Sequence, residues 1–213
     1  MVKRPLVNRI WYRGLYLICR LLAVLIFRIR CDGRHHEPAS GGVLVVSNHQ
    51  SNLDPVLVGL CCRRRLNYVA RDTLFGFAPF RWFINSLDAI PIDREGTGLG
   101  GLKETLRRLK RGEMVLLFPE GTRTRDGRIG RFKSGFCTLA RRAKVPVLPI
   151  AMEGAYHCWP RQQRLPHRAV IHLRVGEPVW PREFDGLSDE QFVTRVHDRV
   201  TQCHAQLGRN GRL

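Results

Sequence analysis

Short hydrophobic runs separated by longer, more polar segments recur along the chain. Six such runs occur, at 43–46, 67–70, 89–92, 114–118, 145–152 and 170–175. The first is continuous and β-branched, and the last alternates between apolar and polar residues. Continuous runs of this length are typical of strands buried on both faces, and alternation is typical of a strand buried on one face. The pattern therefore predicts six strands, of which the last is an edge or half-buried strand.

The segments between these runs have helical periodicity. In 99–109, leucines recur at spacings of three and four, and Glu104 and Arg108 stand one turn apart. Further helices are expected at 54–63, 134–142 and 188–206, with a partly helical, aromatic-rich segment at 73–86. Strands that alternate with helices predict an α/β fold with a layered, mostly parallel central sheet flanked by helices. No repeat or linker interrupts it, so we expect a single domain over 33–213.

The N-terminal residues form a different kind of segment. Residues 15–27 read LYLICRLLAVLIF, which is interrupted by Arg20 and shorter than the roughly 20 apolar residues of a bilayer span. Trp11 and Tyr12 precede it, and arginines flank it on both sides. Aromatic rings and long arginine side chains suit the headgroup region of a membrane. We expect 1–32 to form an amphipathic membrane-surface helix; the alternative is an ordinary core-packing helix.

Composition narrows the possible partners. The chain has 213 residues, 44% of them hydrophobic, which is enough for one packed core. Its formal net charge of +18 attracts anionic lipid headgroups, phosphorylated substrates or nucleic acid. The basic residues are spread along the chain without a nucleic-acid-binding motif, so no nucleic acid is expected as a partner. The Cys count of 7 is odd and includes no C-x-x-C, which predicts free thiols in a reducing compartment.

One polar loop carries a candidate catalytic pair. His49 follows the strand at 43–46, and Asp54 stands five residues later at a helix start with Pro55. A carboxylate that accepts from one imidazole nitrogen leaves the other nitrogen to take a proton. This is the base and orienter of a triad without a nucleophile, a place that a substrate hydroxyl can fill. The alternative is that Asp54 or Ser51 caps the helix and His49 is a hydrogen-bonded loop residue.

Two further loops offer groups that bind phosphate. The candidate residues are Gly121, Thr122 and Arg123 after one predicted strand, Arg94 after another, and Lys133 further along. Glycine permits a tight turn, and hydroxyl, guanidinium and backbone N–H groups donate to phosphate oxygens. Sites in open α/β sheets form outside the carboxyl ends of strands, so we expect these loops to converge. The alternatives are solvated surface arginines and an Asp–Arg surface pair.

Together these loops resemble the glycerolipid acyltransferases, in particular the 1-acylglycerol-3-phosphate (lysophosphatidic acid) acyltransferases. That family has four ordered blocks. They are found here as N-H-x-S-x-x-D (the HX4D motif) at 48–54, an apolar run ending in Arg94, F-P-E-G-T-R at 118–123, and V-P-[VL]-[VL]-P-[VI] at 145–150. The first and third blocks together are highly specific.

The resemblance implies a reaction and a set of roles. His49 is the general base on the acceptor hydroxyl, and Asp54 orients it. The acceptor phosphate site is shaped by Arg94, Glu120, Gly121 and Arg123. Apart from the resemblance, Lys133 is expected to add positive charge at the same site. The acyl donor is acyl-CoA or acyl-carrier protein, the product is phosphatidic acid, and neither a metal nor an acyl-enzyme is involved. The expected setting is an anionic phospholipid membrane, with the protein peripheral or monotopic on its cytoplasmic face.

Other functions stay open at this stage. The acceptor could be glycerol 3-phosphate or another lysolipid, and a thioesterase would use water in place of the hydroxyl. The absence of G-x-S-x-G means that no hydrolase nucleophile elbow is offered. A catalytically inactive lipid-binding relative would not need the His49–Asp54 pair. A basic protein that binds anionic surfaces or nucleic acid without catalysis is the alternative of another class.

Overall fold

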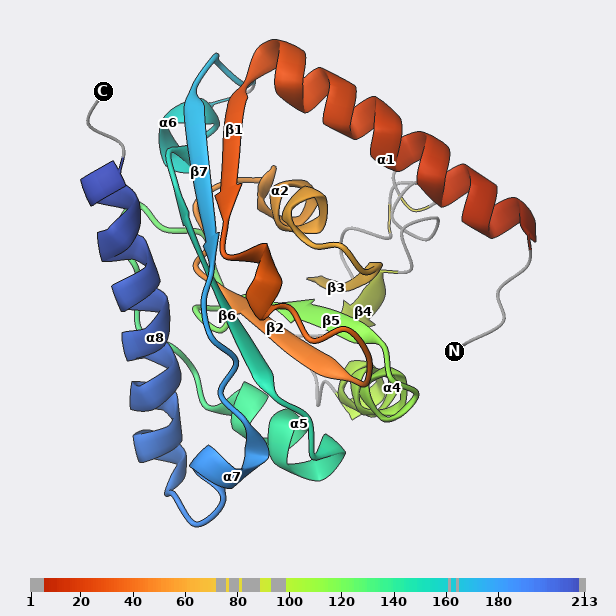
Figure 1. The fold of residues 1–213 in the computed structure, drawn as a ribbon, viewed down its shortest axis with the longest axis vertical. Coiled ribbons are helices and arrows are strands. Elements are labelled where there is room, and N and C mark those ends of the chain that lie inside the picture. The colour runs from red at the N-terminus through yellow and green to blue at the C-terminus, as the bar shows by residue number, and fades with distance from the viewer. Residues whose placement is uncertain are drawn as a thin grey trace.

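A computed structural model describes residues 6–71, 76, 81, 89–92, 99–160, 162–163 and 165–210. Its centre is a seven-stranded sheet of order β1-β7-β6-β2-β5-β3-β4 (Figure 1). The strands are β1 (Arg28–Asp32), β2 (Val43–Ser47), β3 (Leu66–Arg71), β4 (Ile90–Ile92), β5 (Met114–Leu117), β6 (Val147–Glu153) and β7 (Val170–Val175). All neighbours pair in parallel except β6 and β7, which are antiparallel. The predicted α/β fold with a mostly parallel sheet is confirmed.

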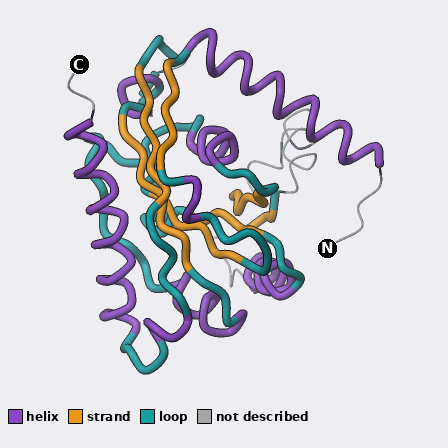
Figure 2. The backbone as a smooth tube through the Cα atoms, in the orientation of Figure 1, coloured by secondary structure: helices purple, strands orange, loops and turns teal. Residues whose placement is uncertain are grey.

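Helices cover both faces of the sheet, as the backbone trace shows (Figure 2). They are α1 (Leu6–Ile26), the 3₁₀ turn η1 (Arg34–His36), α2 (Asp54–Cys61), α4 (Leu99–Lys110), α5 (Gly135–Ala143), α6 (Ala155–Cys158), α7 (Pro181–Phe184) and α8 (Asp189–Asn210). The side chains of β2 alternate between the two layers. Leu44 and Val46 pack with α4, α5 and α8, whereas Val43 and Val45 pack with α2. Burial on both faces explains the continuous apolar sequence of β2.

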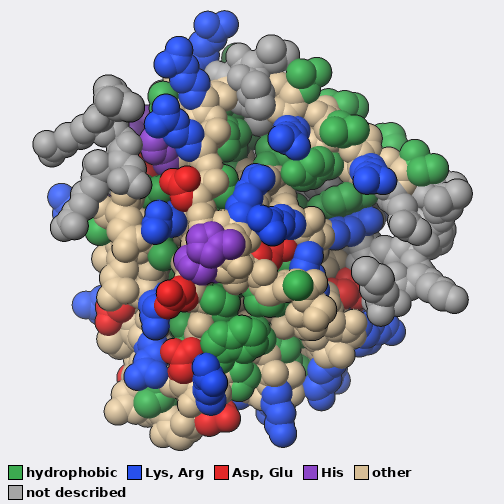
Figure 3. Space-filling model, in the orientation of Figure 1, with side chains coloured by type: hydrophobic (Ala, Val, Ile, Leu, Met, Phe, Trp, Pro, Cys, Tyr) green, Lys and Arg blue, Asp and Glu red, His purple; other side chains and the backbone are tan. Residues whose placement is uncertain are grey.

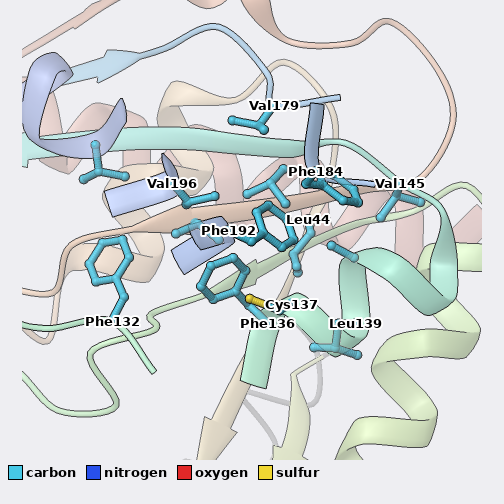
Figure 4. Close-up of a cluster of buried hydrophobic side chains, with 14 of the residues drawn as sticks. Leu44, Phe132, Phe136, Cys137, Leu139, Val145, Val179, Phe184, Phe192 and Val196 are labelled. Carbon is cyan, nitrogen blue, oxygen red and sulfur yellow. The ribbon is translucent and has the colours of Figure 1, made fainter. Parts of the chain in front are cut away.

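Aromatic rings fill the layer under α8 (Figure 4). Phe184 stacks on Phe192 with ring centroids 4.2 Å apart, and Phe136 meets Phe192 edge-on at 5.5 Å. All three rings are fully buried. This layer holds β2, β5 and β6 in place, and these are the strands that end at the candidate site.

The N-terminal segment differs in part from its prediction. After α1 the chain passes through the buried Phe27 and enters β1, which pairs with β7 at the edge of the sheet. The expected unit 1–32 therefore contains a strand as well as a helix. β1 was missed because RIRCD is short and three of its five side chains are charged and exposed, which is characteristic of an edge strand. The segment predicted at 73–86 lies almost entirely outside the described residues.

Two of the cysteines correct the prediction of free thiols. Cys31 on β1 and Cys61 at the end of α2 form a disulfide across a Cα–Cα distance of 5.8 Å. The other five, Cys19, Cys62, Cys137, Cys158 and Cys203, are free. This pair could not be predicted, because the two cysteines are 30 residues apart and meet only when β1 joins the sheet.

α1 leaves one apolar face uncovered. Its exposed large side chains are Ile10, Trp11, Leu17, Ile18 and Leu21, at 42–63% exposure. The space-filling view shows hydrophobic side chains along this helix with Lys and Arg side chains between and beneath them (Figure 3). Within the described part of the chain, no helix is both long enough and apolar enough to cross a bilayer.

Candidate active site

The loop after β2 is fastened to the neighbouring strand by Asn48. Its side-chain Nδ2 donates to the carbonyl of Met152 on β6, and its Oδ1 accepts from the N–H of the same residue, both at 2.9 Å. Asn48 is 1% exposed, so this two-point bond is shielded from water. The next residue, His49, is thereby placed at the carboxyl edge of the sheet.

His49 and Asp54 form the predicted pair. The ring Nδ1 lies 2.7 Å from Asp54 Oδ2, and the same oxygen accepts from the backbone N–H groups of Gln50 and Ser51. The Asp54 carboxylate is fully buried, whereas the His49 side chain is 18% exposed. Since the carboxylate accepts from Nδ1–H, Nε2 carries the free lone pair. Asp54 is the first residue of α2 and binds the preceding loop, so the helix-cap alternative is wrong for its side chain.

Two further features set the environment of this pair. The His49 ring stacks on Phe118, with centroids 4.0 Å apart and planes 13° from parallel. Burial raises the pKa of Asp54 above its usual range, and the hydrogen bonds from His49, Ser51 and Gln50 oppose that rise. The imidazole is therefore held in one orientation between an aromatic plane and a buried carboxyl.

The loop after β5 holds the backbone of His49 on both sides. Glu120 Oε1 accepts from the N–H of His49 at 3.0 Å, and the carbonyl of His49 accepts from the N–H of Thr124 at 2.8 Å. Arg123 is half-buried immediately before Thr124. The two loops are 71 residues apart at the Glu120 contact, and the structure confirms that they meet at one rim.

Gly121 and Lys133 complete this loop. Gly121 has a φ of 74°, a left-handed conformation that favours glycine, and a side chain there would approach Lys133 Nζ to 3.2 Å. The Lys133 N–H donates to the carbonyl of Pro119 at 2.9 Å, which places its ammonium group beside the turn. Thr122 is exposed at the tip.

The last predicted site residue, Arg94, lies outside the described residues. Its strand, β4, ends at Ile92 and runs parallel to β3, which in turn pairs with β5. The roles of Arg94, Glu120, Gly121, Thr122, Arg123 and Lys133 in substrate binding stay predictions. Among the described residues, no three His, Cys, Asp or Glu side chains gather closely enough to hold a metal ion.

A polar network beside the pair was missed in the sequence. The Gln50 side chain donates to the carbonyl of Gly127 at 3.0 Å and accepts from the N–H of Tyr156 at 3.2 Å. It also meets Glu153 Oε2 at 3.5 Å, and this carboxylate pairs with His204 on α8. The network joins two loops, the end of β6, α6 and α8, and no spacing rule relates residues so far apart in the chain.

Glu120 keeps its proton to a higher pH than an ordinary glutamate does. Burial raises its pKa to about 7, while the N–H groups of His49 and Gly130 lower it and the charge of Asp54 raises it. The folded state therefore binds this proton more tightly than the unfolded chain. Its contribution to stability is complete below the ordinary glutamate pKa and is lost as the pH rises toward 7.

We expect Glu120→Gln to remove this loss, because glutamine does not titrate. The variant should gain about 1–3 kcal/mol relative to the wild type between pH 5 and pH 8. Urea unfolding at several pH values measures the difference, with Asp185→Asn, at an exposed carboxylate, as the control. Parallel pH curves for the wild type and Glu120→Gln would contradict the raised pKa.

Comparison with known proteins identifies a family whose profile includes the His49 and Arg123 loops. The Acyltransferase family profile matches residues 28–153. The chain is 29% identical over 168 residues to a chloroplastic 1-acyl-sn-glycerol-3-phosphate acyltransferase of Brassica napus, covering 77% of this chain and 48% of that protein. It is 33% identical over 180 residues to the human 1-acyl-sn-glycerol-3-phosphate acyltransferase alpha, covering 81% of this chain and 61% of that protein.

A solved structure shares the whole fold. The crystal structure of the 1-acyl-sn-glycerophosphate acyltransferase PlsC from Thermotoga maritima has a TM-score of 0.84 at 26% identity, covering 100% of this chain and 85% of that one. The chain spans about half the length of the plant relatives that it matches.

Proposed function

This chain belongs to the Acyltransferase family, and from that premise we propose that it moves a fatty acyl group from a thioester to the free hydroxyl of lysophosphatidic acid. The product is phosphatidic acid, and the donor is acyl-CoA or acyl-carrier protein. The observation that carries the proposal is the partly exposed His49 ring, which the buried Asp54 orients. The backbone of His49 is also bonded to the loop of Arg123. Relatives named as 1-acyl-sn-glycerol-3-phosphate acyltransferases support this acceptor.

In the proposed mechanism, His49 Nε2 takes the proton of the acceptor hydroxyl. The oxygen forms a bond to the thioester carbonyl carbon, the carbon–sulfur bond breaks, and the leaving thiolate takes the proton back from the imidazolium. Asp54 stabilises the imidazolium through the 2.7 Å bond to Nδ1. No covalent enzyme intermediate is needed, because the substrate supplies the nucleophile.

The positive loop next to His49 is the proposed phosphate clamp. Arg123 and Lys133 supply charge, and Thr122 supplies a hydroxyl donor. Gly121 forms the tight turn, and its own N–H donates to the carbonyl of Phe118 at 3.0 Å. We include Arg94 on the ground of its sequence position. Holding the phosphate there fixes the hydroxyl near Nε2, which converts a bimolecular step into an oriented one.

A transfer assay tests the proposal directly. Purified protein in mixed micelles is offered acyl-CoA or acyl-carrier protein against lysophosphatidic acid, glycerol 3-phosphate and other lysolipids. We expect lysophosphatidic acid to be the preferred acceptor. Release of fatty acid at the same rate without any acceptor would identify a thioesterase and overturn the proposal.

Arg123→Ala should raise the KM for lysophosphatidic acid by about 10- to 100-fold with little change in kcat, which is the value of one charge-assisted hydrogen bond. The matched control is Arg125→Ala, at an exposed arginine two residues further along. A phosphate-free monoacylglycerol acceptor provides the second comparison. An equal loss with that acceptor would show that Arg123 does not bind the phosphate.

We also propose that the exposed apolar face of α1 docks on a membrane, with the protein peripheral on the cytoplasmic face. Ile10, Leu17 and Leu21 recur at helical spacing on this face, with Arg13 and Arg20 exposed beside them. Such a face is suited to an interface between headgroups and acyl chains. A protein docked in this way receives the lysolipid acceptor directly from the membrane, so the acceptor does not have to pass through water.

A further inference from the structure

A second positively charged cavity lies under α1, away from His49. It has a volume of about 210 Å³ and is lined by Tyr12, Arg13, Tyr16, Arg63, Arg64 and Arg65. Of the described residues, four arginines and no carboxylate line this cavity. We name it the arginine pocket.

Interactions with the protein body fix two of these arginines. The Arg64 guanidinium donates to the carbonyls of Pro38, Gly41 and Gly112 at 2.7–3.1 Å. The Arg65 guanidinium lies 3.9 Å above the ring of Tyr12, which ties α1 to the start of β3. These two residues build the wall of the arginine pocket.

The other two arginines are available for a ligand. Arg13 and Arg63 are exposed, and over the described ranges neither guanidinium has an ion-pair or hydrogen-bond partner. The carboxylate of Glu37 lies beside Arg63, and its two oxygens accept from the backbone N–H groups of Arg63 and Arg64 at 2.7 and 2.8 Å. Glu37 thus offsets one of the four arginine charges, and the arginine pocket keeps an excess of positive charge, which fits a phosphate group.

Its surroundings favour the phosphate of a lipid over a free ion. An apolar pocket lined by Leu15, Val56 and Leu60 adjoins it and shares Tyr12 and Tyr16. The outer side of the same helix is the exposed apolar face of α1. A headgroup in the arginine pocket would have hydrocarbon-compatible surface beside it.

The arginine pocket is separate from the proposed clamp at Arg123. α2 begins at Asp54, at the carboxyl edge of the sheet where His49 lies. It ends at Cys61, about 10 Å away along the helix axis at 1.5 Å per residue. Arg63 and Arg65 follow that end and precede β3, so they lie toward the amino edge of the sheet. A lipid bound there does not occupy the reaction centre.

We propose that the arginine pocket binds the phosphate of an anionic membrane phospholipid and so holds α1 against anionic bilayers; this inference rests on the proposed membrane docking of α1. Arg13 and Arg63 supply the charge to the headgroup phosphate, and the exposed apolar face of α1 enters the interface. The pocket makes docking selective for anionic lipid, which apolar insertion alone does not.

Vesicle sedimentation tests the inference with the full-length protein. Vesicles of phosphatidylcholine alone are compared with vesicles of four parts phosphatidylcholine to one part phosphatidic acid. The double variant Arg13→Gln/Arg63→Gln should bind the anionic vesicles about 30-fold more weakly, at ~1 kcal/mol for each charge near an anionic surface. The matched control, Arg142→Gln/Arg182→Gln, removes two exposed charges from α5 and α7 and should lose less than about 3-fold.

Four outcomes are informative. Selective loss in the Arg13/Arg63 variant supports the inference, and equal loss in both doubles would show diffuse attraction in place of a site. In the third outcome, inorganic phosphate binds the wild-type protein as tightly as the lipid does and fails to bind the Arg13/Arg63 variant. That result would identify free phosphate as the ligand. Wild-type protein that sediments with neither vesicle would overturn the membrane docking as well, whereas a failed transfer assay leaves this binding result unaffected.

Discussion

His49→Ala is expected to lower kcat for acyl transfer by about 10²–10⁴-fold, the usual contribution of a general base. The reason is local, because the substitution removes the ring while the backbone of residue 49 keeps its bonds to Glu120 and Thr124. The loop should therefore stay in place, and the KM for lysophosphatidic acid should change little. Steady-state kinetics in mixed micelles measures both constants.

The control for this variant is His157→Ala. His157 is an exposed histidine on α6, the short helix that follows β6 at the same rim. Its removal should leave kcat within about twofold, since it has no carboxylate orienter among its described contacts. Wild-type turnover by His49→Ala would end the assignment of a catalytic base.

Asp54 is expected to show two separable effects. Asp54→Ala leaves the ring Nδ1–H and the buried N–H groups of Gln50 and Ser51 without their common acceptor. Each unsatisfied donor costs about 1–3 kcal/mol, so we expect the free energy of unfolding to fall by about 3–5 kcal/mol along with the loss of turnover. Denaturant unfolding and kcat are measured on the same preparation.

Asp54→Asn isolates the charge. Its amide oxygen can occupy the Oδ2 position and accept the same three N–H groups, so the imidazole tautomer is retained. Its NH₂ then takes the place of Oδ1, which is buried and has no hydrogen-bond partner in the described part of the chain. We expect a smaller stability loss than for alanine, with kcat still reduced by about 10²–10³-fold because the imidazolium loses its counter-charge. Turnover equal to the wild type would show that Asp54 serves the fold alone.

Local patterns were enough to predict most of the sheet. The continuous apolar run at 43–46 became β2 because helices cover both of its faces, and the alternating run at 170–175 became the half-buried β7. The helix expected at 54–63 ends at Cys61, two residues early, since Cys62 adopts an extended backbone conformation. His49 and Asp54 were predicted because their contact is nearly local, only five residues apart.

Features made by distant residues could not be predicted in the same way. β1 has no apolar run, and its edge position follows from pairing with a strand about 140 residues later. The Gln50–Glu153–His204 network and the Cys31–Cys61 disulfide depend on which strands become neighbours. A single sequence has no spacing that encodes those meetings, because each of them follows from the topology of the whole sheet.

The connection between α1 and β1 is short and fixes the direction of the N-terminal helix. Only Phe27 separates Ile26 from Arg28, and its ring is buried in the core. Rotation of the helix relative to the sheet is therefore restricted. One residue inserted there would turn the helix by about 100° about its own axis. If α1 docks on a bilayer as proposed, its apolar face would then point away from the lipid, and the depth and tilt of the protein at the membrane would change without any alteration at His49 and Asp54.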